Sequence, residues 1–248
     1  MLPVELQRAL DSISRTPRLL VTCDFDGTLA PIVSNPADAR MLPDAAAALT
    51  ALAELPDTEV ALVSGRALGV LRTLSGMPAT VHLVGSHGAE FDTGFAHDID
   101  AGLLMRIIDT LSEIAADRPG VAVETKPASV ALHVRNANTA DGEAALEAAR
   151  RASATWDAHA TEGKAVLEFA VIKTDKGEAV DILRDQTAST AVVFLGDDVT
   201  DEKAFARMRD GDVGVKVGPG KTLAGLRIES PDDVAEALDY LLQARAQH

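Results

Sequence analysis

The sequence predicts an α/β protein in which a parallel-sheet core is interrupted by an inserted α+β domain. Near both ends of the chain, short apolar runs alternate with amphipathic helical segments, as they do in βαβ units. Between residues 98 and 170 the predicted order changes to helix-strand-strand, repeated twice. Hydrophobic residues make up 47% of the 248 residues and charged residues 25%, which is the composition of a globular protein with ample core-forming material.

The first part of the chain supplies three predicted strands, and each of them ends at polar turn residues. The strands span residues 19–23, 58–63 and 81–84, and helices are predicted between them at 43–55 and 67–74. Short apolar runs that end in turns are typical of buried strands in a parallel sheet. The turns that follow the strands are Asp24-Phe25-Asp26-Gly27-Thr28, Ser64-Gly65-Arg66 and Gly85-Ser86-His87-Gly88.

The rest of the chain divides into the insert and a return to the core. The insert has predicted helices at 103–114 and 141–155, and predicted strands at 121–125, 130–134, 157–161 and 166–169. After Lys176 the first alternation returns, with helix 177–184, strand 191–195, helix 200–208, strand 213–217 and a last helix capped by Ser230 and Pro231. We therefore expect residues 1–97 and 171–248 to form the core and residues 98–170 the inserted domain.

Charge and cysteine content exclude several classes of protein. The 23 basic and 38 acidic residues give a net charge of −15, which works against binding the phosphate backbone of a nucleic acid. A single cysteine, Cys23, excludes an intramolecular disulfide and a cysteine-based zinc cluster. The first twenty residues lack the apolar stretch of a signal peptide, and no apolar run reaches the roughly 20 residues that span a bilayer. We expect a cytoplasmic protein that binds neither nucleic acid nor membrane.

Polar side chains that follow three of the predicted strands should meet at one edge of the sheet, because ligands of open parallel sheets gather at the carboxyl ends of the strands. Carboxylate oxygens with one lysine and one hydroxyl suit Mg²⁺ and a phosphate group. Phosphoryl transfer depends mainly on positioning and on charge stabilisation, which these groups provide. The converging residues are Asp24, Asp26, Ser64, Arg66, Lys176, Asp197, Asp198 and Asp201.

These stretches resemble the four-motif series of the haloacid dehalogenase-like (HAD) phosphatases, and the match extends over the whole predicted core. The motifs are Asp24-Phe25-Asp26-Gly27-Thr28-Leu29, Ser64, Lys176 and Gly196-Asp197-Asp198. Within that superfamily the chain is similar to the trehalose-6-phosphate phosphatases, on residues 63–66, 85–90, 124–135 and 196–202. The resemblance implies a HAD-like Rossmannoid core and makes the αββαββ insert a cap that covers the substrate. Two departures are Ala170-Val171, where that family often has Arg-Pro, and Asp175, where Asn is usual.

The resemblance also implies a role for each matching residue. Asp24 would be the nucleophile that forms an aspartyl-phosphate, and Asp26 would be the general acid and base. Ser64 and Lys176 would bind phosphoryl oxygens. The Mg²⁺ site would use Asp24, the backbone carbonyl of Asp26, Asp197 and, through a bound water or Lys176, Asp201. The substrate-binding residues would be Glu124, Lys126 and Glu168 in the cap, with Arg66 and His87 in the core; for Arg66 the alternative is pairing with an acidic residue, and for His87 a structural role in its turn.

The function implied is Mg²⁺-dependent hydrolysis of trehalose 6-phosphate to trehalose and phosphate, a step of trehalose biosynthesis. Three alternatives stay open: a phosphatase of another sugar phosphate such as sucrose 6-phosphate or mannosylglycerate phosphate, a hexose phosphomutase, and a non-catalytic sugar-phosphate sensor. Only 23 residues precede Asp24, so we expect a phosphatase that is separate from a trehalose-phosphate synthase. We also expect a monomer that can be functionally coupled to such a synthase.

Overall fold

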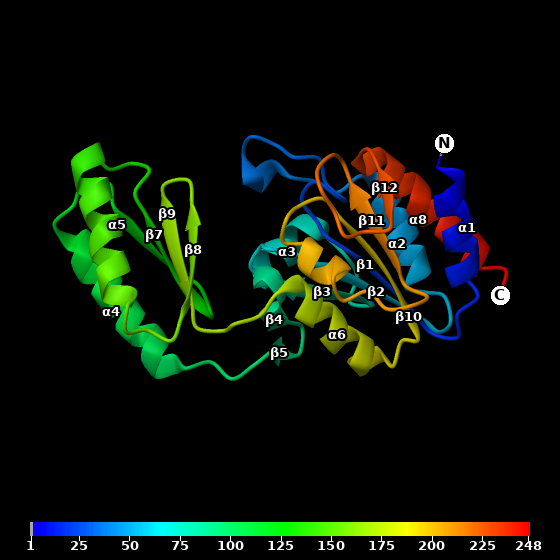
Figure 1. The fold of residues 1–248 in the computed structure, drawn as a ribbon, viewed down its shortest axis with the longest axis horizontal. Coiled ribbons are helices and arrows are strands. Elements are labelled where there is room, and N and C mark those ends of the chain that lie inside the picture. The colour runs from blue at the N-terminus through cyan, green and yellow to red at the C-terminus, as the bar shows by residue number, and fades with distance from the viewer. Residues whose placement is uncertain (1) are drawn as a thin grey trace. The chain divides into compact units, whose positions relative to one another are not determined.

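The computed structural model describes residues 2–248, which divide into two compact units (Figure 1). Unit 1 combines the described residues up to Ala96 with Thr174–His248, and unit 2 consists of His97–Lys173. The chain leaves unit 1 once and returns to it once, so unit 2 is an insertion. Each unit has a sheet and an apolar core of its own.

Unit 1 is built on an eight-stranded sheet in the order β12-β11-β10-β1-β2-β3-β4-β5. The strands from β12 to β3 are parallel, whereas β4 and β5 pair antiparallel at the edge. The sheet is therefore mixed, because a short hairpin extends the parallel part. The strands are β1 (Leu19–Cys23), β2 (Thr58–Val63), β3 (Val81–Gly85), β4 (Glu90–Phe91), β5 (Gly94–Phe95), β10 (Ala191–Gly196), β11 (Val213–Val217) and β12 (Leu226–Ile228).

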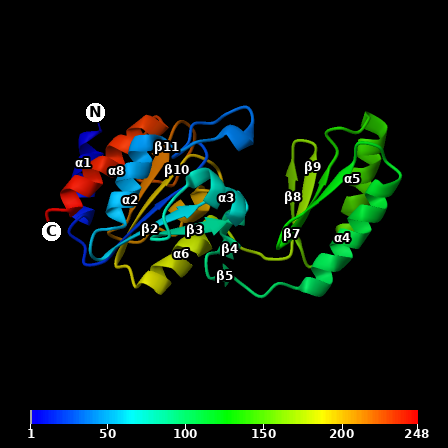
Figure 2. The ribbon, with the colours of Figure 1, turned by 180° about the vertical axis from the view of Figure 1, so that it is seen from behind.

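Helices cover both faces of this sheet, which explains why its central strands are continuous apolar runs. Alternate residues of β1 enter different cores: Leu19 and Val21 pack in the larger cluster, and Leu20 packs in the smaller one. Figures 1 and 2 show the terminal helices together beside the sheet. The larger core includes side chains of α1 (Val4–Ile13), α2 (Pro43–Leu52), α3 (Leu68–Ser75) and α8 (Pro231–Arg245), and the smaller one those of α6 (Lys176–Thr187) and α7 (Glu202–Phe205).

Two helices test the sequence rules used above. The predicted start of α8 is confirmed, because Ser230 is the N-cap, Pro231 is the first residue, and Asp233 completes a capping box. The prediction of a helix over 200–208 is wrong in length, since α7 covers only Glu202–Phe205. The chain leaves the helix there for a turn in which the carboxylate of Asp212 accepts a hydrogen bond from the Arg209 amide at 2.7 Å.

Unit 2 is a four-stranded antiparallel sheet, in the order β6-β7-β9-β8, with two helices packed on one face. Its core contains Phe169, whose ring meets that of Trp156 edge to face at 5.0 Å. The period of two along β6, β7 and β9 places the apolar residues on the helical side and the polar ones on the opposite face, whereas all residues of β8 are exposed. The elements are α4 (Ala101–Ala116), β6 (Ala122–Thr125), β7 (Ser129–His133), α5 (Thr139–Ser153), β8 (His159–Gly163) and β9 (Val166–Ala170).

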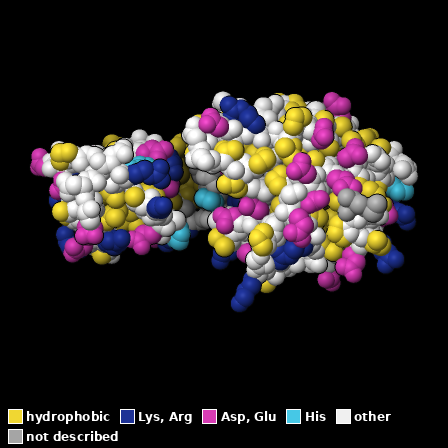
Figure 3. Space-filling view, turned by 90° about the horizontal axis from the view of Figure 1, so that it is seen from above, with side chains coloured by type: hydrophobic (Ala, Val, Ile, Leu, Met, Phe, Trp, Pro, Cys, Tyr) yellow, Lys and Arg dark blue, Asp and Glu magenta, His cyan; other side chains and the backbone are white. Residues whose placement is uncertain are grey.

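The surface of the described residues mixes charges of both signs. Figure 3 shows acidic side chains interspersed with basic ones over the face of unit 1 that it draws. The described part of this unit also contains two 3₁₀ segments, η1 (Pro36–Asp38) and η2 (Ser86–Gly88). Among residues 2–248, no helix has the length and apolarity needed to cross a membrane.

The separate core of unit 2 gives a first prediction. Replacing Phe169 by Ala removes the ring that packs against Trp156, and we expect the free energy of unfolding of unit 2 to fall by about 3–5 kcal/mol. Trp156 is the only tryptophan, so its fluorescence in a urea titration reports on this unit. The control is Met105→Ala, at a side chain that is 55% exposed, with an expected change within about 0.5 kcal/mol. A decrease for Phe169→Ala no larger than for this control would contradict the packing argument.

Candidate active site

A cavity of about 570 Å³ in unit 1 collects most of the residues that the sequence motifs single out. It lies where β1, β2 and β10 end, so that loops distant in sequence become neighbours there. The N-terminal residue of α6 also reaches it. The lining residues are Asp24, Asp26, Ile32, Val33, Pro36, Ser64, Gly65, Arg66, His87, Lys176, Asp197, Asp198 and Thr200.

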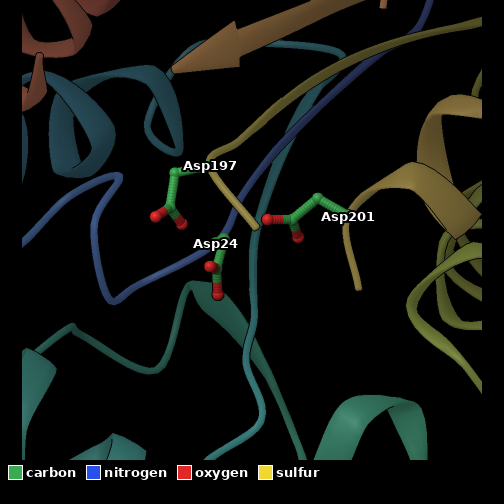
Figure 4. A group of neighbouring side chains, drawn as sticks. All are labelled: Asp24, Asp197 and Asp201. Atoms are coloured by element: carbon green, nitrogen blue, oxygen red, sulfur yellow. The ribbon is translucent and has the colours of Figure 1, made fainter. Parts of the chain in front are cut away.

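Three carboxylates form the most concentrated charge of the cavity. One oxygen each of Asp24, Asp197 and Asp201 can be chosen so that all three lie within 4.8 Å of one another (Figure 4). Asp24 follows β1, whereas Asp197 and Asp201 lie in the loop between β10 and α7. The close approach of Asp197 depends on Gly27, which has a φ of +79°. A Cβ atom at this position would lie 2.1 Å from Oδ2 of Asp197, so a side chain here would displace the carboxylate.

One lysine is shared between two of these carboxylates. The ammonium of Lys176 lies 2.8 Å from Oδ1 of Asp24 and 2.7 Å from Oδ1 of Asp201, and its side chain is only 2% exposed. Burial alone would lower the pKa of Lys176, but the two carboxylates raise it above its usual value. Conversely, burial raises the pKa of Asp24 to about 8 in spite of the lysine. The single positive charge of Lys176 therefore does not neutralise the three carboxylates of this buried cluster.

The donor set fits a divalent cation with hard oxygen ligands, such as Mg²⁺. Burial, followed by the neighbouring carboxylates of Asp201 and Asp198, raises the pKa of Asp197. In addition, Oδ1 of Asp197 is buried and has no hydrogen-bond partner among the described residues. An orphaned carboxylate oxygen at the centre of an acidic cluster is the observation that favours a cation there.

Asp26 lines the cavity, but its side chain pairs with Arg66 and not with the acidic cluster. Its two oxygens accept hydrogen bonds from Nε and Nη2 of Arg66, both at 2.6 Å. The guanidinium also lies over the ring of Phe25, 5.7 Å from its centroid. For Arg66, the structure has the pairing with an acidic residue that the sequence left as an alternative. The metal contact expected of Asp26 concerns its backbone carbonyl and stays a prediction.

Ser64 is held at the floor of the cavity by backbone contacts. Its amide donates to the carbonyl of Val84 at 2.9 Å, and its Oγ accepts a hydrogen bond from the amide of Arg66 at 3.2 Å. Because the hydroxyl oxygen already accepts this bond, its hydrogen is directed elsewhere and can be donated to an anionic oxygen. Ser64 and Asp24 are 1% and 4% exposed, so a group that reaches them is largely removed from water.

Lys216 is a residue of this region that the sequence reasoning missed. It lies on β11 and is 4% exposed, and its ammonium donates hydrogen bonds to the carbonyls of Asp197 and, at 2.7 Å, of Val217. It therefore fixes the backbone that carries Asp197. The signal was available, because a lysine in the middle of the apolar run 213–217 contradicts the pattern of a fully buried strand.

The three residues predicted in the insert lie together on the polar face of the sheet of unit 2. Glu124 and Glu168 are both in register with Ala131, from the strands on either side of it. Glu168 accepts hydrogen bonds from Nζ of Lys126 at 2.9 Å and from Oγ of Ser129 at 2.6 Å. Glu124 instead contacts His133, with 2.8 Å between its Oε2 and Nε2 of the ring. The face thus presents paired polar side chains beside a small central alanine.

Comparison with known proteins relates both units to one family. The family model described as Trehalose-phosphatase matches residues 22–225. The trehalose-6-phosphate phosphatase of Escherichia coli is 36% identical over 234 residues, which cover 90% of this chain and 86% of that protein. An uncharacterized glycosyl hydrolase of Mycobacterium tuberculosis is 34% identical, and the matched region spans only 20% of its length.

Solved structures give the same result for the fold. The C-terminal domain of the C. albicans trehalose-6-phosphate phosphatase has a TM-score of 0.73 at 25% identity, with 97% of both chains covered. A haloacid dehalogenase-like hydrolase from Bacteroides thetaiotaomicron has a TM-score of 0.68 at 14% identity, with 90% of this chain and 98% of that chain covered. The predicted α/β class, with a HAD-like core and an α+β insert, is therefore confirmed.

The buried charge leads to a prediction for the metal-free protein. The pKa of Asp24 is higher in the folded state than its usual 3.8, so the folded state loses stability relative to the unfolded state as pH rises from about 4 to 8. Asn cannot ionise, so Asp24→Asn should raise the Tm measured in EDTA at pH 8, and by less at pH 5. The exposed Asp210→Asn is the control and should show no such gain. A Tm difference between wild type and Asp24→Asn that is the same at both pH values would refute the charge argument.

Proposed function

Because the chain belongs to the trehalose-phosphatase family of HAD-like proteins, we propose that it hydrolyses trehalose 6-phosphate to trehalose and phosphate, with Mg²⁺ as cofactor. The observation that carries the proposal is the Asp24 carboxylate, held by Lys176 in a cavity that also contains Asp26 and Ser64. A nucleophile, a proton carrier and phosphate-binding donors are the groups that transfer of a phosphoryl group to a carboxylate requires.

In the first step, an oxygen of Asp24 attacks phosphorus while the bond between phosphorus and the sugar oxygen breaks. Two unit negative charges 4 Å apart repel by about 4 kcal/mol at an effective dielectric constant of 20, so positive charge must offset this repulsion. Lys176 supplies one charge and also binds a phosphoryl oxygen, together with the hydroxyl of Ser64. A Mg²⁺ ion held by Asp24, Asp197 and the backbone carbonyl of Asp26, with Asp201 nearby, would supply the remaining charge.

Asp26 carries the proton in both steps. It protonates the sugar oxygen as this leaves, and it then accepts a proton from the water that attacks the aspartyl-phosphate. That attack breaks the bond between phosphorus and the Asp24 oxygen, so phosphate is released and the carboxylate is regenerated. Since both Asp26 oxygens accept hydrogen bonds from Arg66, this pair has to open before either oxygen can reach the leaving group.

The insert is the part of the chain that we assign to sugar recognition, with residues 98–170 as its functional limits. Sugar hydroxyls are recognised by polar groups that both donate and accept, and Glu124, Lys126 and Glu168 offer both on one face. These features support a selectivity for a hydroxyl-rich leaving group.

A panel of phosphate esters tests the function. With Mg²⁺, we expect phosphate release from trehalose 6-phosphate to exceed that from glucose 6-phosphate and sucrose 6-phosphate in kcat/KM. Asp24→Asn should reduce kcat by more than about 10³-fold, because it removes the nucleophile. Better hydrolysis of another sugar phosphate would reject the substrate, an isomerised product without free phosphate would indicate a mutase, and full activity of Asp24→Asn would reject the mechanism.

The role of the insert has a test of its own. Lys126→Ala removes a charged donor, and we expect kcat/KM for trehalose 6-phosphate to fall about 10-fold to 100-fold. Hydrolysis of p-nitrophenyl phosphate, whose leaving group has no sugar hydroxyls, should be unchanged. The matched control is Lys173→Ala, which breaks the exposed pair with Asp157 in the same unit and should affect neither substrate. Equal losses on both substrates would show that Lys126 does not act through the sugar.

A further inference from the structure

One peptide group of the acidic site is held from both sides. It joins Asp197 to Asp198, directly after β10. Its carbonyl accepts a hydrogen bond from the ammonium of Lys216, and its N–H donates to Oδ2 of Asp201 at 2.9 Å. Both side chains are buried, with exposed fractions of 4% and 0%. Lys216 and Asp201 thus form a clamp that restricts rotation of the backbone that carries Asp197.

The lysine of this clamp is unusual for its position. It lies on β11 in register with Gly196, and its neighbours Val215 and Val217 pack in the larger core. An ammonium away from water is costly unless hydrogen bonds compensate, and this one donates to the backbone carbonyls of Asp197 and, at 2.7 Å, Val217. An apolar residue would suit the strand without that cost. The buried charge is therefore better explained by a requirement on the position of Asp197 than by the stability of the strand.

The clamp also relates Asp197 to a second carboxylate of the acidic cluster. The other oxygen of Asp201, Oδ1, accepts a hydrogen bond from Nζ of Lys176 at 2.7 Å. The same ammonium lies 2.8 Å from Oδ1 of Asp24. A continuous series of buried contacts thus runs from Lys216, through the clamped peptide, to Asp24. This series restricts how far the carboxylates of Asp24 and Asp197 can move apart.

The position of the Asp197 carboxylate depends on its backbone, because side-chain hydrogen bonds do little to fix it. Its Oδ1 is buried and has no hydrogen-bond partner among the described residues. Its Oδ2 occupies the space beside Gly27, only 2.1 Å from where a Cβ atom of that residue would lie. Rotation of the clamped peptide would therefore move this carboxylate relative to that of Asp24.

Rigidity of the ligands is one property that distinguishes magnesium sites from calcium sites. Mg²⁺ binds oxygen atoms at about 2.0–2.1 Å in a near-ideal octahedron, whereas Ca²⁺ accepts distances of about 2.3–2.6 Å and variable geometry. A site whose ligands cannot move apart therefore favours the smaller ion. We propose that Lys216 is a positioning residue, and that its hold on the carbonyl of Asp197 makes the acidic cluster selective for Mg²⁺ over Ca²⁺. This inference rests on the proposed function in taking the cluster to bind a divalent cation.

The charge of Lys216, taken by itself, predicts an effect of the opposite sign. Burial raises the pKa of the Asp197 carboxyl, and the positive charge of Lys216 is close enough to oppose that rise. Because like charges repel, an ammonium here weakens the binding of any cation. Its removal would then strengthen the binding of Mg²⁺ and Ca²⁺ alike. The positioning role predicts a loss of affinity instead, and a larger loss for Mg²⁺.

The test measures cation binding to the protein without substrate. After dialysis against EDTA and then into metal-free buffer, the rise in Tm with added MgCl₂ or CaCl₂ gives the dissociation constant of each ion. Wild type should bind Mg²⁺ more tightly than Ca²⁺. Lys216→Met keeps a long side chain but removes the donor. We expect its affinity for Mg²⁺ to fall about tenfold and its affinity for Ca²⁺ to fall less than about threefold.

A second lysine provides the matched control. Lys203→Met removes the same charge from an exposed position on α7, so the ratio of its Mg²⁺ and Ca²⁺ affinities should equal that of wild type. Should Lys216→Met not fold, Lys216→Gln takes its place. The amide of Gln can still donate to a carbonyl but has a shorter reach, so we expect the affinity ratio to shift in the same direction by a smaller factor.

Several results would overturn the inference. Tighter binding of both ions by Lys216→Met would show that the lysine acts through its charge, and equal losses would remove its role in selectivity. A lower Tm in EDTA with unchanged affinities would make Lys216 merely structural. Wild type that binds Ca²⁺ as tightly as Mg²⁺ would also contradict it.

The same measurements separate this inference from the proposed function. Wild type that binds neither ion would overturn the inference together with the metal requirement of the proposed function. Wild type that binds Mg²⁺ selectively, loses that selectivity in Lys216→Met and hydrolyses no phosphate ester would overturn the proposed function alone.

Discussion

An excess of buried negative charge at the carboxyl edge of the parallel sheet is the constraint on which the rest of the site depends. Three carboxylates meet there, and the ammonium of Lys176 is shared between Asp24 and Asp201. Two features of the fold maintain this arrangement. Gly27 leaves space for the side chain of Asp197, and the ammonium of Lys216 donates a hydrogen bond to the backbone carbonyl of Asp197. Because carboxylates without counter-charge are unstable away from water, this cluster is consistent with a divalent-metal site.

A second consequence of the topology is that the loops after β2 and β3 act as one element. The amides of Ser86 and His87 bind the carbonyls of Arg66 and Ser64, and Gly65 provides the space for the imidazole. Parallel strands bring successive loops to the same edge, so the turn at Ser86 and His87, where both φ angles are positive, is stabilised by the neighbouring loop. This is how the sheet can hold an exposed side chain in a fixed position without burying it.

How far the sequence predicted this structure depends on the kind of interaction. The strands before Asp24, Ser64 and Asp197 were predictable, because apolar runs and turn residues are local signals. The hairpin of β4 and β5 was missed, since two-residue strands leave no pattern. The Asp26–Arg66 pair was left open because it depends on rotamers of residues 40 positions apart. Lys216 was overlooked even though its charge breaks the apolar pattern of its strand.

The described lysine and arginine side chains that line the cavity are both already paired with carboxylates, and this affects how a phosphate ester could enter. Lys176 is engaged by two carboxylates, and Arg66 is engaged by Asp26 through both of its oxygens. An entering phosphate dianion thus meets a site whose positive charge is already used, and the carboxylates outnumber the basic groups. Under the proposed function, favourable entry of the ester requires additional positive charge at the acidic cluster and separation of Arg66 from Asp26. In the mechanism that we propose, opening of this pair also frees Asp26 for proton transfer, so that ester binding and proton transfer both depend on one ion pair.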